Sequence, residues 1–244
     1  MDALTLQYRA DSDAIESRSA RLISQAWSGL DHTKVADVRD TMTDAVLQSG
    51  VAYGEATSLL TAQYYDDTRA SERVASRYAA EVATDFDAEA TAGSIRWAVG
   101  PLNDQNVVMA LTLVQVVGAA LLRSIGSDTI RLNVGADPAA VGWNRIARAT
   151  SCDFCVMLSQ RGAVYKKATA DFAAHDNDRC TARPSWDPSA PEVDVRAYEA
   201  SQRTSHFREL DAVDGGNRYE THKSRISGWI GDGSQLDSFR SELT

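Results

Sequence analysis

All three cysteines of this chain lie within residues 151–184, and their spacing limits what this part of the chain can form. Cys152 and Cys155 form a C-x-x-C pair, in which two thiolates one tight turn apart can bind the same cation. His175 and Cys180 follow about twenty residues later and would complete a Cys3His set. Such a set is typical of a closed structural zinc site, which stabilises a fold and leaves no position open for chemistry. The spacing therefore predicts a structural zinc ion bound by these four side chains.

Two other interpretations of the cysteines stay open. A C-x-x-C pair also occurs in thiol redox proteins, so Cys152 and Cys155 could form a redox pair or a disulfide. Alternatively, all three cysteines are reduced, buried side chains without a shared ligand. An odd number of cysteines does not suit a pure disulfide framework, and the sequence predicts no βαβ unit that could carry a thioredoxin-like motif. The reducing cytosol expected for this chain favours the metal over a disulfide.

A longer motif surrounds the cysteines on both sides. Its positions are Gly142, Trp143, Arg145, Cys152, Phe154, Cys155, Leu158, Arg161, Gly162, Val164, Tyr165, Phe172, His175, Asp176, Cys180, Thr181 and Pro184. In order and spacing the motif resembles the core of the Mu F-like minor capsid proteins of tailed phages, in particular the branch from phages of actinobacteria. One departure concerns the metal ligands: Asp178 stands where that family usually has the first cysteine of a C-x-C pair, and becomes a candidate oxygen ligand or a support for a ligand. The segment YYDDTR at residues 64–69 resembles the same family more loosely.

The resemblance implies a function in the virus particle. It implies a virion structural protein: a minor capsid (head) protein that is bound to the portal on the capsid interior and assists head assembly or genome delivery. The expected partners are the portal protein, the major capsid protein, packaged DNA and other copies of the chain, after synthesis in the host cytoplasm. The motif positions outside the ligand set are expected to be structural: Trp143, Arg145, Arg161, Gly162 and Pro184.

Composition and the absence of familiar catalytic motifs weigh against several other functions. The net charge of −9 argues against a protein that coats nucleic acid. Neither a phosphate-binding P-loop nor a G-x-S-x-G elbow occurs, and the histidine follows the C-x-x-C pair instead of preceding it as in zinc deaminases. The main alternative is a zinc-stabilised nucleic-acid-processing protein like the HNH nucleases, suggested by His175 and the two residues after it. We expect no catalytic residues and a protein that acts by binding.

Apolar residues at three-to-four spacing predict that residues 1–125 form a helical bundle. The predicted helices cover residues 11–30, 34–62, 71–90, 94–100 and 105–125, with residues 64–69 as a junction and Gly126 as the last stop signal. The third of these helices rests on a four-residue repeat of apolar side chains: Val74, Tyr78, Val82 and Phe86. Four side chains from different parts of the bundle are expected to be buried: Trp27, Val46, Leu59 and Val114.

The most apolar segment, residues 107–122, is predicted to be a buried helix of this bundle. It is too short to span a bilayer comfortably, and Gln115 interrupts it, so no membrane span is expected.

After residue 125 the helical pattern of apolar residues gives way to other sequence patterns. Residues 126–186 are predicted to form a small α+β module, with strands at 143–150 and 156–165 around the cysteine pair. Residues 187–244 contain prolines, glycines and short helical patterns with few apolar anchors, which predicts an extended, partly helical arm that docks on a partner. The predicted fold class is therefore mainly α, with the domains 1–125, 126–186 and 187–244.

Overall fold

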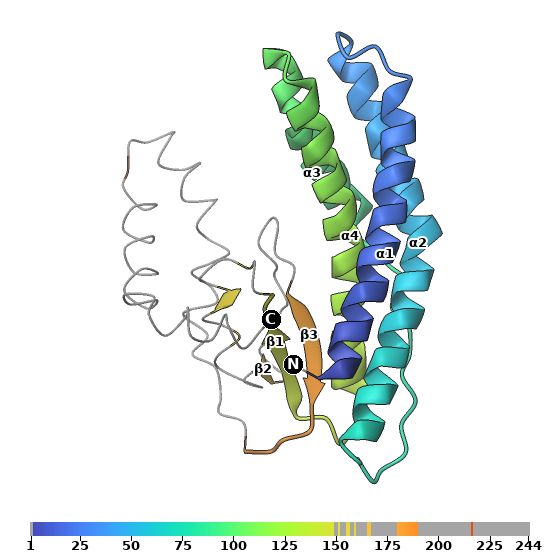
Figure 1. The fold of residues 1–244 in the computed structure, drawn as a ribbon, viewed down its shortest axis with the longest axis vertical. Coiled ribbons are helices and arrows are strands. Elements are labelled where there is room, and N and C mark those ends of the chain that lie inside the picture. The colour runs from blue at the N-terminus through green and yellow to red at the C-terminus, as the bar shows by residue number, and fades with distance from the viewer. Residues whose placement is uncertain are drawn as a thin grey trace. The chain divides into compact units, whose positions relative to one another are not determined.

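The protein is mainly helical, as predicted (Figure 1). The computed structural model describes residues 2–148, 151, 155–156, 159, 165–166, 180–189 and 216. The chain divides into two compact units, with the boundary between Asp137 and Pro138. The predicted C-terminal arm, residues 187–244, lies almost entirely outside the described residues.

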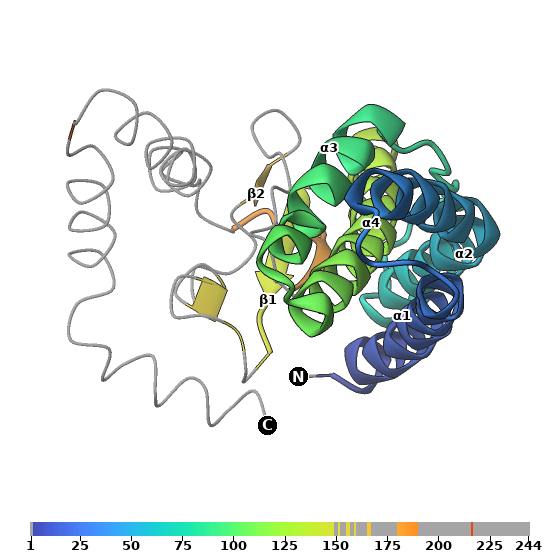
Figure 2. The ribbon, with the colours of Figure 1, turned by 90° about the horizontal axis from the view of Figure 1, so that it is seen from above.

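The first unit is a helical bundle. Its elements are α1 (Ala3–Ser28), α2 (Val35–Ser71), α3 (Ala88–Ala98), the 3-10 turn η1 (Gly100–Asp104) and α4 (Val107–Ala136). The three long helices α1, α2 and α4 pack against one another, and the short α3 packs against α2 and α4 (Figure 2). The helical N-terminal bundle predicted from the apolar periodicity is confirmed.

The bundle core contains three of the four side chains that were expected there. Trp27, Val46 and Val114 are buried, but Leu59 is 56% exposed, so its predicted burial is wrong. In the part of α2 that contains Leu59, the buried face consists of small or hydroxyl-bearing residues, because the neighbouring helices approach closely. The apolar core consists of Ile23, Trp27, Val38, Met42, Ala45, Val46, Ile95, Ala98, Val99, Leu102, Ala110, Val114, Val117, Leu121, Leu122 and Ile125.

Helix α1 is joined to α2 largely through hydroxyl groups. The Thr5 and Tyr64 hydroxyls are 2.9 Å apart, and those of Ser19 and Ser49 are 2.5 Å apart. Tyr8 stacks on Tyr64 with ring centroids 4.3 Å apart. These contacts explain why the predicted junction at residues 64–69 is wrong: α2 continues through the segment, and its polar side chains are satisfied inside the bundle.

A segment that we call the strap, residues 74–87, connects α2 to α3 without helix or strand structure (Figure 1). The predicted helix at residues 71–90 is therefore wrong over most of its length. Helix α2 ends at Ser71, and Arg73, just beyond its end, is in the left-handed region at φ 54°. Helix α3 begins only after Asp87, whose side chain accepts a hydrogen bond from the Ala90 N–H at 2.8 Å.

Helix α4 is longer than predicted and runs past Gly126 to Ala136. It is long and apolar enough to cross a membrane by length and composition alone. In the bundle one face of it contributes core residues, including Ala110, Val114 and Ile125, while Val108 and Met109 are exposed.

The second unit contains a small antiparallel sheet with the strand order β2-β1-β3. Its strands are β1 (Gly142–Ile146), β2 (Tyr165–Lys166) and β3 (Thr181–Ser185). The first strand lies close to its predicted place. The second predicted strand, 156–165, is wrong at its start, because Val156 and Ser159 are helical.

Candidate functional site

The structure describes two of the four predicted zinc ligands. The side chains of Cys155 and Cys180 are both buried, with exposed fractions of 1% and 8%, and neither forms a disulfide. Cys152, His175 and Asp178 lie outside the described residues, so the convergence of the four ligands stays a prediction. Within the described part of the chain, no group of three or more His, Cys, Asp or Glu side chains could hold a metal ion.

The turn after β1 brings the start of the C-x-x-C segment close to Cys180. Arg148 and Ser151 close this turn: the Arg148 N–H donates to Ser151 Oγ and the Ser151 N–H donates to the Arg148 carbonyl, each at 2.9 Å. Ile146 pairs with Thr181 across the sheet, which places Cys180 directly beside the end of β1. The Ser151 Oγ lies 3.9 Å from the Cys180 Sγ. The residue preceding Cys152 is thus in contact with the third cysteine.

The motif residues on the sheet are buried. Trp143 and Arg145 on β1 are each 2% exposed, and Pro184 on β3 is buried and pairs with Trp143 across the strands. This arrangement fits the structural role expected for these three positions. The other two positions, Arg161 and Gly162, lie outside the described residues.

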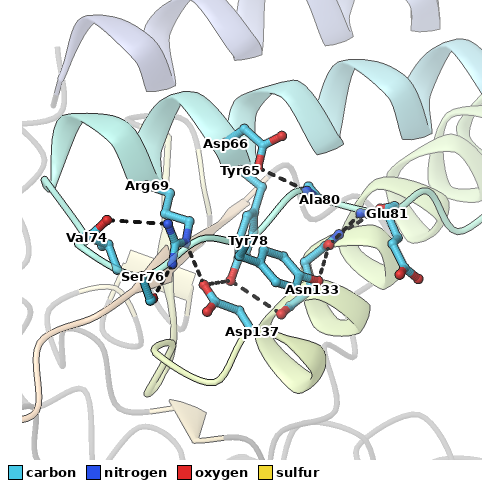
Figure 3. Close-up of polar contacts among 10 residues, drawn as sticks. All are labelled: Tyr65, Asp66, Arg69, Val74, Ser76, Tyr78, Ala80, Glu81, Asn133 and Asp137. Atoms are coloured by element: carbon cyan, nitrogen blue, oxygen red, sulfur yellow. Dashed lines mark hydrogen bonds and ion pairs between the residues drawn. The ribbon is translucent and has the colours of Figure 1, made fainter.

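A second candidate site, not recognised in the sequence, is a buried polar cluster in the bundle made by Tyr65, Arg69, Tyr78, Asn133 and Asp137 (Figure 3). At its centre, Arg69 Nε lies 2.9 Å from Asp137 Oδ2, and the two side chains are 8% and 0% exposed. The Tyr65 hydroxyl donates to the same carboxylate oxygen at 3.1 Å. The ion pair joins the C-terminal end of α2 to the residue that follows α4.

The same arginine also holds the beginning of the strap. Its guanidinium donates to the Ser76 Oγ at 2.6 Å and to the Val74 carbonyl at 3.5 Å. It also lies over the Tyr78 ring, 6.0 Å from the ring centroid. Arg69 therefore links three segments: α2, the strap and the end of α4.

Asn133 of α4 binds the main chain of the strap through both atoms of its side-chain amide. Its carbonyl oxygen accepts from the Glu81 N–H at 2.7 Å, and its amide nitrogen donates to the Glu81 carbonyl at 2.8 Å. The Tyr78 hydroxyl donates to the same Asn133 oxygen at 2.8 Å. Beside it, the Asp66 carboxylate accepts from the Ala80 N–H at 3.0 Å.

The tyrosines of the cluster are poor acids in this environment. Burial, together with the nearby Asp137 charge, raises the pKa of Tyr65 far above its usual value. Burial and the Glu81 charge also raise the pKa of Tyr78. Both phenols are therefore neutral hydrogen-bond donors at neutral pH, and the cluster is suited to fixing the positions of α2, the strap and α4.

Sequence reasoning found only part of this cluster. The segment at residues 64–69 was singled out for its resemblance, but Asn133 and Asp137 were not. A polar residue near the end of an apolar helix gives no signal in a single sequence, because only the fold brings it to Arg69 or to the strap.

The fold and these sites define a helical-bundle protein that carries a small, cysteine-containing sheet module. The profile of the VG15 protein family matches residues 2–205, which is most of the chain and includes the bundle unit and part of the second unit. The chain therefore belongs to the VG15 family, and this membership indicates a phage-encoded protein. No curated protein and no solved structure matches the chain significantly.

Proposed function

We propose that this chain is a virion structural protein: a minor capsid protein of the Mu F-like type, bound to the portal on the capsid interior, where it assists head assembly or genome delivery. The observation that carries the proposal is the match to a phage-encoded family across the bundle and the cysteine motif together. The dense motif of residues 142–184 supports the Mu F-like assignment. The buried places of Trp143, Arg145 and Pro184 agree with a motif that maintains a fold.

On this proposal the protein acts by binding. Two observations support this: Arg69 and Asp137 form a buried ion pair, and Cys155 and Cys180 lie in the interior of the small module. The proposed partners are the portal protein, the major capsid protein, packaged DNA and other copies of the chain. The arm at residues 187–244 is proposed to dock on one of them.

We also propose a structural zinc ion bound by Cys152, Cys155, His175 and Cys180, with Asp178 beside the ligands. The described residues fit this set in two respects. Cys155 and Cys180 are buried reduced thiols, and the contact of Ser151 with Cys180 places the neighbour of Cys152 at the third cysteine. A small module gains stability from a metal that joins its segments. When bound, the zinc would supply folding free energy and no reaction chemistry.

Co-purification tests the virion assignment. Full-length protein carrying an affinity tag is expected to retain the portal protein of the same phage, and to be present in purified procapsids. A chain truncated after Trp186 is expected to fold but to enter particles at a reduced level. Absence from particles would contradict the proposal. Metal-dependent cleavage of plasmid DNA that is lost on His175→Ala would instead support the nuclease alternative.

Metal analysis of the purified full chain tests the zinc site. We expect about one zinc per chain, lost in Cys180→Ser and His175→Ala, each with a lowered melting temperature. His206→Ala is the matched control, because this histidine lies outside the motif and should leave the zinc content unchanged. Stoichiometric zinc that survives both ligand substitutions would show that the ligand set is wrong.

A further inference from the structure

The strap has the sequence of a helix although it is not helical in the structure. Its 14 residues, 74–87, contain no glycine or proline and include four alanines. The large apolar side chains recur every fourth residue, at Val74, Tyr78, Val82 and Phe86, which is the spacing of one helix face. Local preference and observed structure therefore disagree over the whole segment, and such conflicts concentrate at strained or functional places.

Side chains of α2 and α4 replace the hydrogen bonds that a helix would make. No backbone–backbone hydrogen bond forms among residues 75–86, all of which the structure describes. The Glu81 N–H and carbonyl are instead bound by Asn133 (Figure 3), and the Ala83 N–H donates to Thr129 Oγ1 at 3.3 Å. The Ala83 carbonyl accepts from the Ser58 hydroxyl. We call Ser58, Thr129 and Asn133 the latch.

The strap buries few of its own side chains. Val82 is 41% exposed, and among residues 79–87 only every third residue is half-buried, namely Ala80, Ala83 and Phe86. A period of three is that of the polyproline II conformation, which has no internal hydrogen bonds. No side chain of the strap is fully buried, although Phe86 packs against the bundle core, so the hydrogen bonds of the latch are needed to hold the extended form.

Strain is present where the strap begins. The Arg73 N–H donates to the Ala70 carbonyl and the Val74 N–H donates to the Arg69 carbonyl, which is the hydrogen-bond pattern of a Schellman helix end. This pattern puts Arg73 at the left-handed position that glycine usually occupies. If the strap became helical, Arg73 would no longer have to adopt the left-handed conformation.

We propose that the strap is a conformational switch, extended while the latch holds its main chain and helical when the latch opens. In the helical form residues 74–87 lengthen α3 toward its N-terminus. At 1.5 Å per residue the 14 residues add about 21 Å, which makes the extended α3 comparable in length to α4. The helical form also gathers the four apolar side chains of the strap on one face, where a partner could bind them.

Distance measurements on the full chain test the switch. Spin labels on non-natural amino acids at Ala75 and Asp85, both exposed, avoid the cysteines. Ten residues span about 31 Å in a polyproline II conformation and about 15 Å in a helix. The otherwise unchanged protein is expected to show the long distance, and Asn133→Leu is expected to add a population at the short distance. The milder pair Thr129→Val and Ser58→Ala is a second way to open the latch should Asn133→Leu fail to fold.

Ala79→Pro is the matched control. Ala79 is exposed, its N–H is not bound by the latch, and proline suits an extended segment but not a helix interior. Added to either opened-latch variant, it is expected to abolish the short distance. The proposal is overturned if no opened-latch variant shows the short distance, or if that distance persists with Ala79→Pro.

Discussion

Ile23 of α1 packs directly against Gly118 of α4, so closely that a Cβ on Gly118 would lie 2.5 Å from the Ile23 Cδ1. Ile23 is completely buried, so its side chain has little room to move away. The absence of a side chain at one position of α4 therefore sets the distance at which α1 docks.

Gly118→Ala is expected to lower the free energy of unfolding by about 1 kcal/mol. The overpacking cost of about 1–3 kcal/mol exceeds the helix propensity that alanine gains over glycine. Gly135→Ala in the same helix is the control, because nothing lies within 4 Å of its added Cβ, and it should be neutral or stabilising. Adding Ile23→Val, which removes the clashing methyl group, should recover part of the loss in urea denaturation. No recovery would show that the two residues are not in the contact described.

Asp137→Asn is expected to destabilise the bundle by about 3–5 kcal/mol, because it leaves the Arg69 guanidinium buried without its counter-charge. The double variant Arg69→Met, Asp137→Leu removes both charges and should lose less than the single variant. Denaturant titrations of the parent protein, Arg69→Met, Asp137→Leu and the double variant form the cycle that measures the coupling. Purely additive losses would contradict a buried ion pair.

Arg73→Gly is expected to stabilise the protein by about 0.5–1 kcal/mol, because glycine adopts the left-handed conformation without the penalty of a Cβ. Arg77→Gly, at an exposed strap position that is not left-handed, should give no gain. Melting temperatures of the two variants make the comparison. An equal effect at both positions would mean that Arg73 is not strained.

Stability is expected to fall as the pH rises above about 10. Burial raises the pKa values of Tyr8 and Tyr65 in the folded protein. Below about pH 10 the folded and the unfolded protein both keep these protons, so the tyrosines do not make the free energy of unfolding vary with pH. Above about pH 10 the unfolded chain loses protons that the folded chain keeps, which costs about 1.4 kcal/mol per pH unit for each tyrosine. Unfolding free energies at several alkaline pH values should show a smaller slope in Tyr65→Phe. An unchanged slope would refute the contribution of Tyr65.

The sequence was sufficient to predict the helical bundle but not all of its buried faces. Val38, Met42 and Val46 form the buried stripe of α2 as the apolar period indicates. Further along, the stripe passes to Gly54 and Thr57, while the more apolar Leu59 faces solvent. Hydropathy ranks leucine above glycine for burial, but close helix packing favours the smaller residue.

The strap and the polar cluster could not be predicted for a different reason. The four-residue repeat at Val74 and Tyr78 predicts a helix that the structure does not contain, because Asn133 binds the main chain of this segment through tertiary hydrogen bonds. Asp137 likewise acquires its role only because α2 and α4 bring it to Arg69, 68 residues away in sequence. For the cysteine module, the structure shows that Cys155 and Cys180 are buried, and the ligand set itself stays a prediction.

Asp137 is the last residue of the bundle unit, and the chain leaves it at Pro138. Mechanical tension applied to the following chain reaches the bundle at this residue, whose carboxylate is fastened to Arg69 and Tyr65 of another helix. A force on this part of the chain therefore acts on α2 as well, instead of unwinding only the C-terminal end of α4. The point at which the chain leaves the bundle is thus secured on two helices instead of one.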